Sequence, residues 1–93
     1  MIRVLDIYTN DGLKLTLSVR LSSHGRPTLF IGIGLGICVS AACEDVTLFA
    51  YDDAPNVACL DMPGCSILFN PEFLGDVEAL LFEAAEMKSE FLL

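Results

Sequence analysis

Hydrophobic and polar residues alternate strictly along residues 13–21, and this period of two predicts a β-strand with one core face and one solvent face. Residues 2–9 precede it as a second predicted strand, and Asn10-Asp11-Gly12 has the composition of the turn between them. The chain is therefore expected to begin with a β-hairpin.

Two registers compete for this hairpin. A two-residue loop would place Asp6 opposite Leu17 in the core, whereas a three-residue loop with Gly12 in the left-handed conformation keeps Asp6 outside. We expect the three-residue loop because it buries aliphatic side chains only. The pairs it predicts are Leu5 with Leu17 and Ile7 with Leu15.

Glycine alternates with aliphatic residues in the segment 28–39. The pattern predicts one strand over Thr28–Val39, with a bare strip on one face formed by Gly32, Gly34 and Gly36. Glycine weakens a strand interior, so three in register indicate a close approach to the backbone by the C-terminal helix or an aromatic ring, or by a ligand or partner strand. A helix with the Gly32–Gly36 spacing is the less favoured alternative, because the period is two.

Shorter apolar runs follow. Val46–Tyr51 is a predicted strand, and residues 52–56 form a polar loop. Val57–Met62 and Cys65–Phe69 flank Pro63-Gly64, the pair typical of a type II turn, so they predict a second hairpin.

The C-terminal segment predicts a helix that starts at Asn70-Pro71-Glu72, with Asn as the cap and Pro at the first helical position. Its expected packing face consists of Phe73, Val77, Leu80, Leu81, Ala84 and Phe91. Together these elements predict a single domain over residues 1–93 of the α+β class. Its expected form is an antiparallel sheet of five to six strands, N-terminal hairpin first, with one C-terminal helix packed on it.

A stripe of carboxylates runs along this predicted helix. Its members, separated by steps of 4, 7, 3 and 4 residues, are Glu72, Asp76, Glu83, Glu86 and Glu90. Like charges at helical neighbour spacing repel by about 0.2–0.5 kcal/mol per pair, so the stripe does not serve the fold. Phe82 lies beside it as a candidate anchor, and Asp52 and Asp53 are candidate additions to the acidic surface.

Composition and charge narrow the classes of function. The chain is 54% hydrophobic, so either most positions are buried on both sides or some apolar surface is covered by another subunit or partner, as in a homodimer. The net charge of −8 divides into +2 over residues 1–27 and −10 over residues 28–93, which disfavours direct nucleic-acid binding. The acidic part either attracts a basic partner or only keeps an apolar chain soluble, which is the more general use of net charge. No signal peptide opens the chain and the longest uncharged run has 17 residues, so we expect a cytoplasmic protein without a membrane span.

No chemical motif is apparent. The chain has four cysteines, Cys38, Cys43, Cys59 and Cys65, separated by four, fifteen and five residues. The first gap is within the range tolerated in a zinc knuckle, but the second is too long for the usual tight pair, so we expect the cysteines to be small core hydrophobes. Residues 32–36 lack the third glycine and following helix of a dinucleotide loop, and His24 is expected to be a solvated loop residue. The sequence therefore predicts no catalytic residue, metal or cofactor.

These observations favour a small acidic, non-enzymatic protein that docks on a basic surface of a protein or nucleoprotein, such as a nucleic-acid-binding protein, and blocks it. Small acidic domains without motifs are typical of phage-encoded inhibitors of bacterial defence such as anti-CRISPR proteins, which would act in the host cytoplasm. This association rests on composition alone. The alternatives are a homo-oligomeric assembly subunit and, third, a cysteine-dependent metal-binding domain.

Overall fold

The computed structural model describes the backbone of residues 3–34, 36–50 and 56–92, and the side chains of residues 4–34, 36–50 and 56–86. Within these ranges the elements are β1 (Arg3–Tyr8), β2 (Lys14–Leu21), β3 (Pro27–Ile33), β4 (Ile37–Ala42), the 3-10 turn η1 (Cys43–Asp45), β5 (Thr47–Ala50), β6 (Ala58–Met62), β7 (Cys65–Phe69), the 3-10 turn η2 (Pro71–Phe73) and α1 (Leu74–Leu92). Asp52 and Asp53, the candidate additions to the acidic surface, lie outside the described residues.

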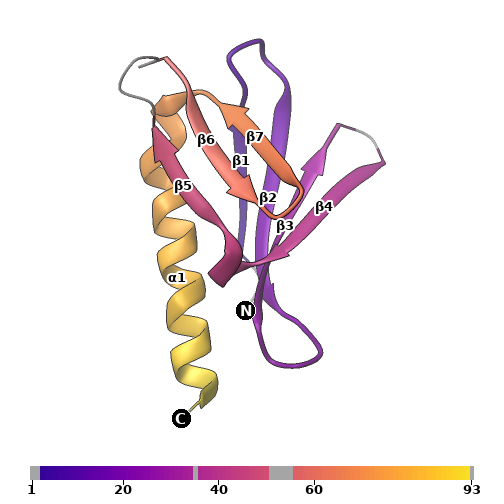
Figure 1. The fold of residues 1–93 in the computed structure, drawn as a ribbon, viewed down its shortest axis with the longest axis vertical. Helices are drawn as coiled ribbons and strands as arrows, with labels where there is room; N and C mark the ends of the chain where they lie inside the picture. The colour runs from indigo at the N-terminus through magenta and orange to yellow at the C-terminus, as the bar shows by residue number, and fades with distance from the viewer. Residues whose placement is uncertain (1–2, 35, 51–55, 93) are drawn as a thin grey trace.

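The strands form two antiparallel sheets, of order β1-β2-β3-β4 and β5-β6-β7. Figure 1 shows the three-stranded sheet in front of the four-stranded one, with α1 alongside both. The α+β class is confirmed, but the prediction of a single sheet of five to six strands is wrong. At η1 the chain leaves the first sheet, and the next three strands, β5–β7, pack their apolar side chains against that sheet instead of extending its edge.

The N-terminal hairpin has the predicted register. Leu5 pairs with Leu17 and Ile7 with Leu15, while Gly12 has a φ of 91°. Asp6 is exposed, and its carboxylate accepts a hydrogen bond of 2.9 Å from the Thr16 hydroxyl.

The predicted single strand over Thr28–Val39 is wrong. It divides into β3 and β4, which pair through Ile33 and Ile37 around a turn where Gly34 and Gly36 have φ values of 61° and 88°. Gly32 alone of the three glycines remains within a strand, and a Cβ added there would meet Thr16 at an ordinary 3.8 Å. The glycines at positions 34 and 36 therefore make a tight turn possible, and the prediction of a bare strip of three glycines on one strand face is wrong.

The turn and helix-start predictions are confirmed. Met62 pairs with Cys65 across Pro63-Gly64, and Gly64 has the positive φ of 79° that a type II turn requires. The Asn70 side chain accepts a hydrogen bond of 3.0 Å from the Glu72 N–H, and Pro71 opens η2, which leads directly into α1.

The core lies between the two sheets and the helix, which contacts β1, β2 and β3. Of the predicted packing face, Val77, Leu80 and Ala84 are buried, and Phe73 and Leu81 are half-buried. The side chain of Phe91 lies outside the described residues. The remaining buried hydrophobic residues are Ile7, Leu15, Leu17, Val19, Leu29, Ile31, Ala58, Cys59, Leu60, Met62, Ile67 and Phe69.

The cysteines do not share one environment. Cys59 is buried as predicted and Cys43 and Cys65 are half-buried, but Cys38 is exposed, so the expectation of a core residue is wrong for Cys38. It lies on the outer face of β4, an edge strand that no other described strand covers. His24 is exposed in the β2–β3 turn, which confirms it as a solvated loop residue.

Candidate partner-binding surface

The outer side of the C-terminal helix carries the candidate site. The cap at Asn70 fixes where the helix begins, and the buried side chains of Val77, Leu80 and Ala84 fix which side faces the core. Exposed carboxylates on η2 and α1 belong to Glu72, Asp76, Glu78 and Glu86. We refer to these four residues, together with Phe82, as the acidic helix face.

Two predicted members of the stripe differ from the others. Glu83 is half-buried and has an interaction of its own, so it is left out of the acidic helix face. Glu90 belongs to α1, but its side chain lies outside the described residues.

An aromatic residue protrudes from the centre of this face. Phe82 is 67% exposed, the highest value among the exposed large hydrophobic residues in the described part of the chain. Glu78 and Glu86 lie four residues before and after Phe82, so the three side chains form one row along the helix. Glu78 was missed because it falls outside the 4-7-3-4 spacing of the stripe. The spacing of four residues between Glu78, Phe82 and Glu86 in the sequence could have identified it.

The residues around Phe82 are small. Gly75 lies seven residues before Phe82, Ala79 lies three residues before it, and Ala85 lies three residues after it. All three are exposed. A Cβ added at Gly75 would meet nothing within 4 Å, so packing inside the chain does not explain the glycine. A partner would therefore be able to approach the helix backbone closely on either side of the aromatic ring.

The carboxylates of the acidic helix face are exposed. Within the described side chains, no hydrogen bond or ion pair involves the carboxylates of Glu72, Asp76, Glu78 or Glu86. An ion pair between described side chains lies away from this face, between Arg26 and Glu44, whose Nη1 and Oε1 atoms are 3.5 Å apart. No described side chain therefore competes with a basic group of a partner for these four exposed carboxylates.

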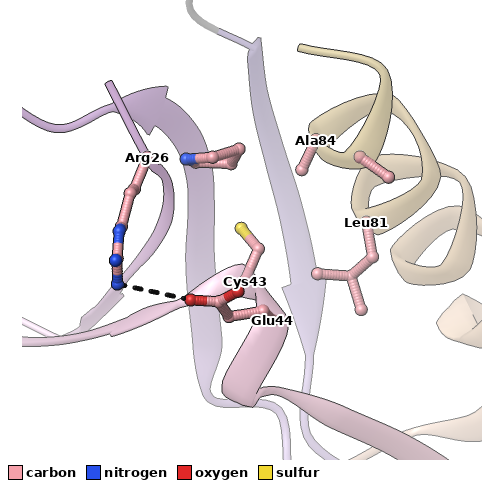
Figure 2. Close-up of a pocket in the computed structure, with 7 residues that line it drawn as sticks. Arg26, Cys43, Glu44, Leu81 and Ala84 are labelled. Atoms are coloured by element: carbon pink, nitrogen blue, oxygen red, sulfur yellow. Dashed lines mark hydrogen bonds and ion pairs between the residues drawn. The ribbon is translucent and has the colours of Figure 1, made fainter. Parts of the chain in front are cut away.

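A hollow of about 230 Å³ adjoins this face (Figure 2). It is lined by Arg26 and Pro27 at the start of β3, Cys43 and Glu44 of η1, and Leu81, Ala84 and Ala85 of α1. The Arg26–Glu44 pair lies at one side, while Leu81 and Ala84 point in from the helix. Because these residues are far apart in the sequence, local patterns could not reveal the hollow.

The chemistry of the hollow is that of an apolar recess. Burial raises the pKa of the Cys43 thiol to about 11, so the thiol is protonated at neutral pH and is a poor nucleophile. Its charged lining residues, Arg26 and Glu44, are paired with each other. The recess is therefore suited to receive an apolar group and provides no activated nucleophile.

A second, more open hollow lies on the same flank of the helix, between α1 and β5. It has a volume of about 470 Å³, and its lining residues are Leu48, Phe49, Ala50, Leu74, Glu78 and Leu81. Leu81 lines both hollows, and Glu78 belongs to both the second hollow and the acidic helix face. The surface beside Phe82 is consequently uneven, with recesses of apolar lining next to a charged row.

Neither a metal centre nor a membrane-spanning helix is found in the described part of the chain. No three His, Cys, Asp or Glu residues gather there in a way that would hold a metal ion. None of its helices has the length and apolarity needed to cross a bilayer. Comparisons with protein-family models, with curated proteins and with solved structures gave no match.

Proposed function

We propose that this chain is a non-enzymatic binding protein that docks its acidic helix face into an apolar groove with a basic rim on a protein partner, and blocks that surface. The observation that carries the proposal is the exposure of Phe82 between Glu78 and Glu86, whose carboxylates have no partner among the described residues. An exposed helix face of this kind matches the mode in which a helix inserts into a groove of its partner.

The two kinds of side chain would act at different ranges. Carboxylates steer a basic surface toward the helix over about one Debye length, roughly 8 Å at physiological salt. Aromatic residues are enriched among the few interface residues that dominate affinity, and Phe82 has the exposure needed to be such an anchor. Gly75 and Ala79 leave room for the walls of the groove on one side of it.

The charge distribution supports the choice of partner. A face with four exposed carboxylates repels phosphate backbones, so the proposed target is a basic protein surface and not the nucleic acid itself. A nucleic-acid-binding groove of another protein has this basic chemistry, and blocking it in the cytoplasm is how a phage-encoded inhibitor would act. That setting remains the proposal suggested by composition.

The test uses the whole chain immobilised as bait against extract from its native cells, with bound proteins quantified by mass spectrometry. Bait variants F82S and E86K are compared with D45K, which makes the same charge change at an exposed acid on η1. We expect a basic protein to bind the wild type and D45K, and to be lost from F82S and E86K and from all baits in high salt.

Two outcomes contradict the proposal. One is a partner that binds F82S and E86K as well as it binds the wild type, because the acidic helix face would then be only a solubility device. The other is a loss of binding equal for D45K and E86K, because net charge and not this face would then determine recognition. Circular dichroism of each variant shows that the bait is folded.

A further inference from the structure

β4 is an edge strand without the features that usually protect one. It is an outer strand of the four-stranded sheet, and its sequence Ile-Cys-Val-Ser-Ala-Ala contains no charged residue and no proline. Free strand edges present unpaired backbone N–H and C=O groups, and proteins usually block them with lysine, proline, bulges or short length. None of these devices is present in the six residues of β4.

The apolar side chains of β4 are also incompletely covered. Ile37 belongs to the same face of the sheet as the core residues Leu15 and Ile33, with which it shares a row, yet it is 59% exposed. Val39, in the next row on that face, is only half-buried. The core layer therefore ends before it reaches the edge of this sheet.

The other edges are less open. At β1, the Tyr8 carbonyl accepts a hydrogen bond of 3.0 Å from the Asn70 N–H, and the strand contains Arg3 and Asp6. β5 has only four residues. β7 keeps its inward side chain Ile67 buried, and on its outer face the Asp61 carboxylate of the neighbouring strand bonds to Ser66. β7 is also uncharged, and Leu68 on its outer face is 53% exposed, but it has five residues and its inward side chains Ile67 and Phe69 are buried. β4 differs in having six residues and in leaving Ile37, on the core side of its sheet, 59% exposed.

We infer that β4 pairs with β4 of a second copy of this chain, antiparallel about a two-fold axis, to form a continuous eight-stranded sheet across a homodimer. This interface is separate from the acidic helix face and does not depend on the proposed function. With the axis at Val39, Ile37 lies opposite Ala41 and Cys38 opposite Ser40 of the other copy. The large side chain then faces a small one, and no charged residue of β4 enters the interface.

The position of the charges favours this partner over others. Each copy has a net charge of −8, and a dimer joined through the helices would bring like charges together. β4 and α1 lie at opposite sides of the molecule (Figure 1). Pairing at β4 therefore keeps the two acidic helices far apart, and Glu44 and Asp45 beyond the end of β4 lie toward the uncharged Gly34–Gly36 turn of the other copy. A second copy presents an equally neutral edge of the same length.

The test is the mass of the full chain in solution, measured by size-exclusion chromatography with light scattering over a range of concentrations. We expect the wild type to reach twice its 10.1 kDa at high concentration, in low and in high salt alike. The variant S40K places an ammonium group at the centre of the edge, and we expect it to weaken the dimer at least about 10-fold. The control S66K makes the same change on the exposed outer face of β7 and should remain dimeric.

Three results would overturn the inference: a wild type that stays monomeric at the highest concentration, an S40K variant that dimerises as well as the wild type, and a dimer that high salt dissociates. Thermal unfolding of S40K followed by circular dichroism separates loss of pairing from loss of fold. If S40K does not fold, the variant S40E takes its place with the same expectation. The helix-face variant E86K should leave the dimer unchanged, so this inference and the proposed function fail independently.

Discussion

Replacing Glu86 by Gln should stabilise the protein, and the helix geometry gives the magnitude. Glu83 lies three residues before Glu86 and Glu90 lies four residues after it, so Glu86 has two acidic neighbours along α1. Each like-charge pair at this spacing costs about 0.2–0.5 kcal/mol, so E86Q should raise the free energy of unfolding by about 0.4–1.0 kcal/mol. Gln and Glu have nearly the same helix propensity, so propensity adds nothing to the difference.

The same substitution at Glu78 is the matched control. The residues three and four positions away from Glu78 are Leu74, Gly75, Leu81 and Phe82, none of which is charged. Both changes remove one negative charge from an exposed position of the same helix, so the effect of net charge is common to both. We therefore expect E78Q to change the free energy of unfolding by less than E86Q does, within about 0.2 kcal/mol of the wild type.

The assay is urea unfolding followed by circular dichroism, with a thermal melt as a second measurement. For a domain of this size the expected gain for E86Q corresponds to about 2–8 °C in Tm. The advantage over E78Q should shrink in 1 M salt, where the Debye length is only about 3 Å. If E86Q is less stable than the wild type, Glu86 has a structural partner, and the claim that the acidic face costs stability fails. If E86Q is more stable but binds its partner more weakly, Glu86 lowers the stability of the fold while strengthening recognition of the partner.

Three further changes test the fold and the hollow. L80A should lower the free energy of unfolding by about 2–5 kcal/mol, because Leu80 is 1% exposed in the core, and a loss below 1 kcal/mol in urea unfolding would contradict that placement. G36A should lower the free energy of unfolding by about 1–2 kcal/mol because Gly36 has a φ of 88°. G75A lies in a helix with open space around it and should raise the free energy of unfolding by up to about 1 kcal/mol. If thermal melts show the same effect for both variants, Gly36 does not have the positive φ that the β3–β4 turn requires. Since burial raises the pKa of Cys43 from 9.0 to about 11, the folded state holds this proton more tightly. The stability that this protonated thiol contributes is present below pH 9 and is lost as the pH rises to 11. C43A should therefore reduce the fall in the free energy of unfolding measured between pH 8 and pH 11. If the pH profile of C43A equals that of the wild type, the raised pKa of Cys43 is refuted.

Short-range patterns in the sequence determined much of the local structure. The register of the β1–β2 hairpin followed from burying Leu5 and Leu17 while excluding Asp6, and Gly12 made the necessary turn. The Pro63-Gly64 turn and the helix start at Asn70 followed from the backbone preferences of those residues. These features depend on interactions within a few residues, which a local pattern encodes fully.

The stripe of carboxylates was also readable, because helical periodicity fixes which residues share a side. The sequence did not show which residues make up the acidic helix face in the structure. The structure adds Glu78 to the face around Phe82 and gives Glu83 an interaction of its own. Periodicity assigns an angle around the helix, but the partners available at that angle come from elements far away in the chain.

Only the tertiary structure decided how the strands divide into two sheets, why the run of alternating glycines bends at Gly34 and Gly36, and which cysteine is exposed. An alternation of glycine with aliphatic residues is compatible with a continuous strand and with a hairpin, since glycine accepts both signs of φ. The choice between them is made by burial summed over the whole chain. Folding back at Gly34–Gly36 leaves β4 as an edge, and placing β5–β7 over the first sheet covers core residues that one extended sheet would leave to the helix alone.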